Sequence, residues 1–321
     1  MHRRRFLLAT PALALAGPAA AVIADGRPIK LVVAYAPGGG TDLMARAVAQ
    51  HLGAALGQNV VVDNKAGGNG TVGSLSVAQA RPDGTTLLFA TGSELSLKPL
   101  LEAGLPYDPA RDFVPVALLG ITPVAIAVNP EVPARNVAEL IALARTKPGG
   151  IDVANSGRGG IMHLTAAYLA LKAGVEFGHV SYRGAAPAVA DAVAGTVDAV
   201  VSGLPPLLAQ AKEGRLRILA VSIPQRSGAL PEVPTLAEEG FPGFDMSNTV
   251  GLVARRGCPP EIVAALNAAA NQAIEKPDLR RIFLANGAEP VGSTAERYAT
   301  FIQAERDRFR EVVQATRITM E

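Results

Sequence analysis

The strongest chemical signal in this chain is a short glycine-rich segment. Residues 37–42 read PGGGTD, and they stand between a β-branched apolar run and an Ala- and Leu-rich segment with helical spacing. Because glycine lacks a Cβ, such a loop can bend tightly and leave its amides uncovered, and at a helix start those amides carry about half a positive charge. Gly39, Gly40, Thr41 and Asp42 therefore predict a cradle for a carboxylate or a phosphate. A plain strand-to-helix turn capped by Asp42 is the alternative interpretation.

A second loop of the same type lies further along the chain. Residues 181–187 read SYRGAAP, again between a predicted strand and a predicted helix. Ligands of open α/β sheets bind beyond the carboxyl ends of the strands, so two such loops from two domains can close on one ligand. We expect Gly184, Ala185 and Ala186 to form the second side of the site. Arg183 either pairs with a second carboxylate of the ligand or covers the surface.

A third glycine-rich segment resembles a cofactor site only superficially. Residues 68–73 read GNGTVG, which matches the pattern G-x-G-x-x-G, and Glu94 follows at about the distance of a ribose-binding acid. The first strand-to-helix turn, however, lies at residues 38–40, and a lone match to this pattern is weak. No Gly-Lys-Ser/Thr follows residues 37–42 either, which argues against a nucleotide P-loop. We therefore interpret residues 68–73 as a tight turn and expect no nucleotide cofactor.

Catalytic and metal-binding patterns are missing from the sequence. It contains no G-x-S-x-G and no H-E-x-x-H, and its single cysteine, Cys258, has no histidine near it in the chain. One cysteine and four scattered histidines leave little for a metal centre. His163 follows the loop at residues 155–160, so it either faces a cleft or is an ordinary core histidine. We expect no catalytic residue, no cofactor and no metal.

Composition describes an exported globular protein. The 321 residues are 49% hydrophobic and 18% charged, which excludes a disordered chain, and a net charge of +2 gives no preference for nucleic acid. Three arginines at positions 3–5 precede a run without charge to residue 24, interrupted by prolines and too short to span a bilayer. Residues 1–24 therefore predict a signal peptide, cleaved after Ala21 or Ala24, of Sec or twin-arginine type.

The remaining chain predicts an α/β protein of two domains. Short β-branched runs alternate with helical segments, a pattern typical of mainly parallel sheets. Residues 114–128 hold two apolar runs around a proline, too long for one strand, and we interpret them as the passage between domains. The predicted division places residues 25–122 and 249–321 in domain 1 and residues 123–248 in domain 2.

Several segments in fixed order resemble one known family. They are AYAPGGGTD at 34–42, DNKAGGNG at 63–70, RPDGTTL at 81–87, YRGAAPA at 182–188, GTVD at 195–198 and PEVPT at 231–235. In this order, and after an export signal, they resemble the solute receptors of tripartite tricarboxylate transporters, the Bug family of periplasmic binding proteins. The resemblance covers essentially the whole chain after residue 24.

The resemblance implies a Venus-flytrap fold that holds a small carboxylate between two α/β domains. It implies a monomer in the periplasm that delivers its ligand to the permease subunits of the transporter. It also adds residues lining the cleft to the two loops above: Tyr35, Thr91, Ser93, Ser156, Gly160 and His163. After residues 197–198 the family often has Phe-Asp-Asn, whereas this chain has Val201, Ser202 and Gly203, so the contacts to the far end of the ligand differ. An exported hydrolase or dehydrogenase using the same cleft, and a ligand-sensing subunit, are the alternatives.

Overall fold

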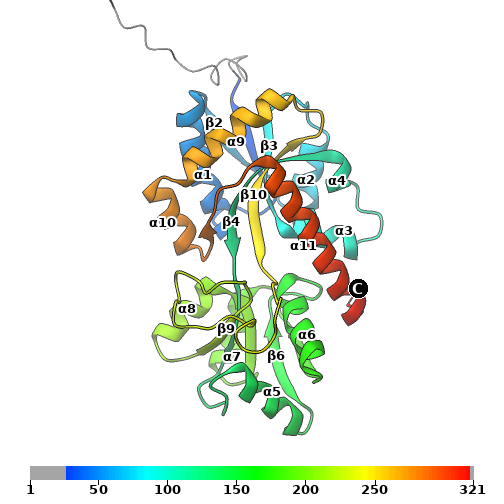
Figure 1. Cartoon of the computed structure of the whole chain (residues 1–321), viewed down its shortest axis with the longest axis vertical. Coiled ribbons are helices and arrows are strands. Elements are labelled where there is room, and N and C mark those ends of the chain that lie inside the picture. The colour runs from blue at the N-terminus through cyan, green and yellow to red at the C-terminus, as the bar shows by residue number, and fades with distance from the viewer. Residues whose placement is uncertain (1–26, 319–321) are drawn as a thin grey trace, which may run out of the picture.

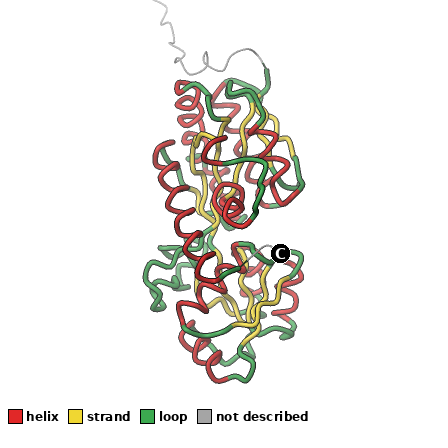
Figure 2. The backbone as a smooth tube through the Cα atoms, turned by 90° about the vertical axis from the view of Figure 1, so that its right-hand side faces the viewer, coloured by secondary structure: helices red, strands yellow, loops and turns green. Residues whose placement is uncertain are grey.

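A computed structural model describes residues 27–318 as two lobes stacked along the long axis of the molecule (Figure 1). Each lobe has a β-sheet with helices on its outside, and the side view shows the strands gathered into one group per lobe (Figure 2). The predicted signal peptide at residues 1–24 lies outside the described residues. Within residues 27–318 no helix combines the length and the hydropathy that a membrane crossing requires.

The first lobe is built on a six-stranded sheet. Its order is β11-β4-β10-β3-β1-β2. One face packs against helices α1, α9 and α10, and the other against α2, a π-helical turn at Ser93–Leu97 and the short helix α4, whereas Leu100 and Leu101 of α3 pack against the core of the second lobe. The bounds are β1 Ile29–Val33, α1 Gly40–Leu56, β2 Val60–Asn64, α2 Thr71–Ala78, β3 Thr86–Thr91, α3 Lys98–Leu101, α4 Pro109–Asp112, β4 Phe113–Thr122, β10 Asn248–Arg255, α9 Pro260–Ile274, α10 Pro277–Ala285 and β11 Glu289–Pro290.

The second lobe is built on a five-stranded sheet in the order β7-β6-β8-β5-β9. Helices α5 and α6 cover one face, and α7 and α8 cover the other. The bounds are β5 Val124–Val128, α5 Val137–Thr146, β6 Ile151–Asn155, α6 Ile161–Ala173, β7 Phe177–Ser181, α7 Ala185–Val193, β8 Ala199–Gly203, α8 Leu204–Lys212 and β9 Arg217–Val221.

Both sheets are mixed, so the prediction of mainly parallel sheets is wrong. The pairs β1–β2, β1–β3, β6–β7 and β6–β8 are parallel, whereas the pairs made by β10 and β5 are antiparallel. The reason is the path between the lobes. The chain leaves the first lobe along β4, enters the second at Pro123 and β5, and returns along β10, whose first residue Asn248 pairs with Thr122. An outgoing strand and a returning strand side by side must run in opposite directions.

Helix α11 (Ala295–Thr316) joins the two lobes along one side (Figure 1). Tyr298 belongs to a core cluster of the first lobe, with Phe301 and Ile302 packed against it. Phe309 and Val312 belong to the core of the second lobe. A single apolar stripe of this helix thus packs into the cores of both lobes. The limits predicted for the two domains, 25–122 with 249–321 and 123–248, stay predictions.

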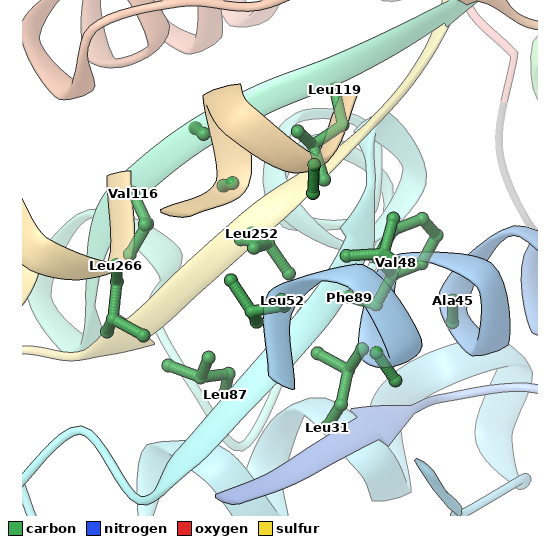
Figure 3. Packing of buried hydrophobic residues seen from close by; sticks show 14 of the residues in the cluster. Leu31, Ala45, Val48, Leu52, Leu87, Phe89, Val116, Leu119, Leu252 and Leu266 are labelled. Atoms are coloured by element: carbon green, nitrogen blue, oxygen red, sulfur yellow. The ribbon is translucent and has the colours of Figure 1, made fainter. Parts of the chain in front are cut away.

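The core beneath α1 fixes the position of the predicted cradle. Leu31, Leu87 and Phe89 point from the strands toward Val48 and Leu52 of α1 (Figure 3). These side chains are fully buried or nearly so. Burying an aliphatic side chain of this size contributes about 1.5–3 kcal/mol, so the helix is held firmly and its first turn is fixed beyond the carboxyl end of β1.

A close approach at Gly251, in the crossing strand β10, gives a test of this packing. A Cβ at Gly251 would lie 2.6 Å from the carbonyl oxygen of Ala117 and 2.6 Å from the ring of the fully buried Tyr298. We expect Gly251→Ala to lower the free energy of unfolding by about 1–3 kcal/mol, because neither neighbour can withdraw. Chemical denaturation measures this.

Gly203→Ala is the matched control. A Cβ at Gly203 would have its closest contact 3.9 Å away, at Cε of Met162, so the only expected cost is the poorer N-cap that alanine gives α8, below about 1 kcal/mol. Equal effects of the two substitutions would contradict the described packing around β10.

Candidate functional site

Two adjoining cavities lie between the lobes. The first has a volume of about 250 Å³ and the second about 210 Å³, and they share Ser93, Leu97 and Ile161. The first is otherwise lined by Tyr35, Thr41, Thr91, Gly92, Asn248 and Phe309. The second is otherwise lined by Asn69, Lys98, Leu101, Met162 and the loop at residues 156–160. Both lobes therefore contribute to each cavity.

The first lobe brings four predicted residues to the first cavity. Thr41 comes from the first turn of α1, whereas Tyr35, Thr91 and Ser93 come from the segments that follow β1 and β3. Strands β1 and β3 are parallel neighbours, so their carboxyl ends meet at one edge of the sheet. The hydroxyl oxygens of Tyr35 and Thr91 lie 3.5 Å apart. The wall is therefore rich in hydroxyl groups, and none of the residues that line this first cavity carries a formal charge.

The start of α1 has the uncovered amides that the sequence predicts. Gly39 is the N-cap, with extended backbone angles and no side-chain hydrogen bond to the first turn. Gly39 and Gly40 are exposed and do not line the two cavities themselves. The following residue, Thr41, does. The positive end of this helix therefore lies at the edge of the first cavity.

Asp42 is turned back into the protein. Its Oδ2 accepts hydrogen bonds of 2.9 Å from the Gly38 amide and from Nε of Arg46, and its Oδ1 accepts one of 2.8 Å from Asn64. Burial alone would raise the pKa of Asp42, but these donors hold it below its ordinary value. The carboxylate therefore stays ionised and fixes the shape of the loop.

The second lobe contributes the start of α6. Ser156 and Gly160 line the second cavity, and Ile161, the first residue of α6, lines both. Gly160 is the N-cap of this helix and, like Gly39, makes no side-chain hydrogen bond to the first turn. Two helix starts without side-chain caps, one from each lobe, therefore border the same space between the lobes.

His163 supports this loop from within. It is buried and lines neither cavity; its Nδ1 accepts a 3.0 Å hydrogen bond from the Gly159 amide. Its ring packs edge-on against His179, with 4.7 Å between centroids. Burial, then the neighbouring His179 and Arg158, lower the pKa of His163 to about 4. The imidazole is therefore neutral near pH 7, as an acceptor must be.

The second predicted loop leads into helix α7 and is not part of the lining of either cavity. Gly184 is the N-cap of α7, with a φ of 121° that favours glycine, and it too makes no side-chain cap. Neither Arg183 nor Gly184, Ala185 or Ala186 lines either cavity. Of the predicted residues of the second lobe, Ser156 and Gly160 at the α6 start line the second cavity, and those at the α7 start line neither.

Sequence reasoning missed the apolar and hinge residues of the site. Phe309 is buried in the core of the second lobe and also lines the first cavity, whereas Leu97 and Ile161 carry no sequence motif. Asn248 stands where the chain returns to the first lobe. Its place before a predicted crossing strand was the one signal that could have identified it.

Comparison with known proteins agrees with this geometry. The sequence profile described as "Tripartite tricarboxylate transporter family receptor" matches residues 44–318. The protein BugT of Bordetella pertussis is 37% identical over 308 residues, which cover 95% of this chain and 94% of that protein. The chain belongs to this receptor family.

Solved structures give the same answer for the fold. A TctC solute-binding protein from Polaromonas, without ligand, superposes with a TM-score of 0.80 at 32% identity, covering 90% of this chain and 99% of that one. An R. palustris protein solved with adipate has a TM-score of 0.79 at 32% identity, covering 92% and 99%. The two-lobed α/β fold of this receptor is therefore that of the periplasmic binding proteins.

Two buried carboxyl groups of the receptor stand behind the cavities. Glu94 is fully buried, and one of its oxygens accepts hydrogen bonds from the amide and the hydroxyl of Thr91. Burial raises its pKa. The segment that resembled a dinucleotide site lies next to Glu94, since a Cβ at Gly70 would touch the Glu94 side chain. Nζ of Lys98 donates hydrogen bonds to the carbonyl oxygens of Gly68 and Asn69 in this segment.

Glu305 lies where α11 crosses from one lobe to the other. Its carboxyl group accepts hydrogen bonds from Ser96 at 2.5 Å and from Thr249 in β10 at 3.1 Å. Burial raises the pKa of Glu305 to about 7; the two hydroxyls and Arg308 oppose this shift, while Asp245 adds to it. The protonation state of Glu305 therefore makes the stability of the contacts between α11, Ser96 and β10 depend on pH.

The direction of this coupling follows from the raised pKa. The unfolded chain ionises Glu305 at lower pH than the folded chain, so the stability that it contributes is present below about pH 4.5 and is lost as the pH rises through about 7. We expect the wild type to lose roughly 1–3 kcal/mol relative to Glu305→Gln between pH 5 and pH 8. Urea denaturation at a series of pH values measures the difference.

Glu275→Gln is the control, because Glu275 is exposed at the end of α9. Its stability profile should follow that of the wild type across this pH range. A Glu305→Gln profile parallel to that of the wild type would show that Glu305 does not titrate in this window.

Proposed function

We propose that this receptor captures a small organic carboxylate between its lobes in the periplasm and delivers it to the permease of a tripartite tricarboxylate transporter. One observation carries the proposal. Helices α1 and α6, one from each lobe, start without side-chain caps, and Thr41 and Ile161 at their starts line one cavity. Amides at such a position bind anions without a charged side chain.

The energetics are sufficient for a receptor. Hydrogen bonds to a charged group contribute roughly 1.5–3 kcal/mol each. A few of them, given by the amides of the α1 start and the hydroxyls of Tyr35, Thr41 and Ser93, reach the approximately −8 kcal/mol of a micromolar complex. No acid, imidazole, thiol or amine lines the first cavity, so the ligand there meets binding groups only. This favours a receptor over an enzyme.

Closure of the lobes completes the site in this proposal. Beside the crossing strand β4, Oε1 of Glu289 in β11 accepts a hydrogen bond of 2.6 Å from Ser227 and one of 2.9 Å from the Gly228 amide, and these two residues follow β9. A ligand that bridges the lobes binds the closed state more tightly and so shifts the balance toward it. Closure would bring the α7 start, with Gly184, Ala185 and Ala186, toward the ligand.

The comparisons support the ligand class. The R. palustris relative was solved with adipate, a dicarboxylate, and the family itself is one of tricarboxylate transporter receptors. The family and the predicted signal peptide both support a periplasmic location. A receptor that reports its ligand to a signalling partner would use the same capture step, and it would differ only in the protein that binds the closed form.

Thr41→Val tests the cradle with little change in shape. The substitution removes a hydroxyl that lines the first cavity and leaves the backbone angles of the helix start accessible. We expect the affinity for the best acid of an organic acid library to fall about tenfold to a hundredfold, the value of one hydrogen bond to a charge. Isothermal titration calorimetry measures the affinity, after melting-temperature shifts have identified the acid.

Thr146→Val at the end of α5 is the matched control, since its hydroxyl bonds only to carbonyls of its own helix. It should bind as the wild type does. If no organic acid raises the melting temperature of the folded wild-type protein, the proposed function is wrong.

A further inference from the structure

The second cavity differs from the first in its electrostatics. Whereas no lining residue of the first cavity is charged, Lys98 and Arg158 line the second. The two cavities share Ser93, Leu97 and Ile161, so a ligand held in the first can extend into the second. Which of the two cations is available to such a ligand depends on their own contacts.

Lys98 is already neutralised within the first lobe. Its ammonium lies 2.7 Å from Oε1 of Glu102 and donates a 2.6 Å hydrogen bond to the carbonyl oxygen of Gly68. Its side chain is only 3% exposed. Lys98 therefore holds the glycine-rich turn at residues 67–70 and has little capacity left for a ligand.

Arg158 is in the opposite situation. Within residues 27–318 its guanidinium makes no hydrogen bond and no ion pair, and the residue is exposed at the cavity wall. Guanidinium groups bind carboxylates through two parallel hydrogen bonds when one is offered. A free guanidinium at a cavity between two lobes is thus a site for a negative group that enters from outside.

The backbone that carries Arg158 is anchored on both sides. Oδ1 of the buried Asn155 accepts a 3.1 Å hydrogen bond from the Gly157 amide, and Nδ1 of His163 accepts one of 3.0 Å from the Gly159 amide. The Gly160 amide closes the turn onto the carbonyl oxygen of Gly157 at 3.2 Å. The φ angles of Gly157 and Gly159, 158° and 71°, set the shape of this turn. Arg158 is therefore presented from a fixed loop.

Two of the three residues that the cavities share have apolar side chains, and the third is Ser93. Leu97 and Ile161 belong to both cavities, and Phe309 lines the first. A ligand that joins hydroxyls and amides at one end to a guanidinium at the other must pass these side chains. A hydrocarbon segment passes them favourably, whereas additional hydroxyl or carboxyl groups in the middle of the ligand would lose their hydration there.

We infer that the ligand is a dicarboxylate with an apolar spacer, and that Arg158 binds its second carboxylate. This inference rests on the proposed function, because it takes the first carboxylate to lie at the α1 start. It assigns Arg158 the selection of dianions over monoanions. Arg183, which lines neither cavity, takes no part in this selection.

The experiment compares each acid with a neutral partner of the same shape. The unbranched dicarboxylates from succinate to pimelate and their monoamides are titrated into the wild type and into Arg158→Met by calorimetry. We expect the wild type to prefer the best dicarboxylate over its monoamide about tenfold to a hundredfold. Arg158→Met should lose this preference and bind the monoamide as the wild type does.

Arg135→Met controls for net charge. Arg135 is exposed and lines neither cavity; it stands two residues before α5, the helix at the far end of the second lobe (Figure 1). Its substitution should therefore leave the preference intact. Arg158→Lys should retain part of the preference, because the charge remains and the paired hydrogen bonds do not.

The outcomes separate this inference from the function on which it rests. If monocarboxylates bind to the wild type as tightly as dicarboxylates do, or if Arg158→Met keeps the preference for the dianion, Arg158 does not select the ligand although the receptor function stands. If no acid of either kind binds, the proposed function fails and this inference fails with it.

Discussion

The site depends on one electrostatic arrangement: the amides of two helix starts border a shared space, and no side chain covers them. A glycine N-cap leaves these donors free, whereas Ser, Thr, Asp or Asn at the same position would bind them. At α1 and at α6 the caps are Gly39 and Gly160. Everything else in the fold serves to hold these starts in place. The core under α1 fixes one of them, and the hydrogen bonds of Asn155 and His163 fix the loop that leads to the other.

The connection between the lobes determines how these two starts can move. Strands β4, β5 and β10 carry the chain across, and α11 spans the same boundary with its apolar stripe divided between two cores. Glu305 stands at that boundary, bonded to Ser96 and to Thr249 of β10. A change in its protonation alters the hydrogen bonds that join α11 to β10 and to the π-helical turn at Ser93–Leu97. The first cavity is thus adjacent to the segments that cross between the lobes, because Asn248 of β10 and Phe309 of α11 line it.

The sequence predicted what short-range chemistry determines. The PGGGTD segment, the helix after it and the two-lobed α/β class all followed from glycine placement and periodicity, and the family resemblance supplied Tyr35, Thr91 and Ser93, which line the first cavity. Helices α8 and α10 were not predicted; each has proline in its first turn, where this residue is well tolerated. Long-range relations were beyond reach. Nothing local shows that Asp42 is hydrogen-bonded to Asn64 and Arg46, that Lys98 is paired with Glu102, or that the α7 start lines neither cavity.

The central claim is tested most directly by a crystal structure of the protein with the acid that most raises its melting temperature. The account predicts one carboxylate of the ligand within hydrogen-bond distance of the amides of residues 40–42 and of the Thr41 hydroxyl, with the body of the ligand against Leu97 and Ile161. A ligand bound away from the α1 start, such as in the groove beside Ile223 and Glu289, or one held only by charged side chains, would contradict it.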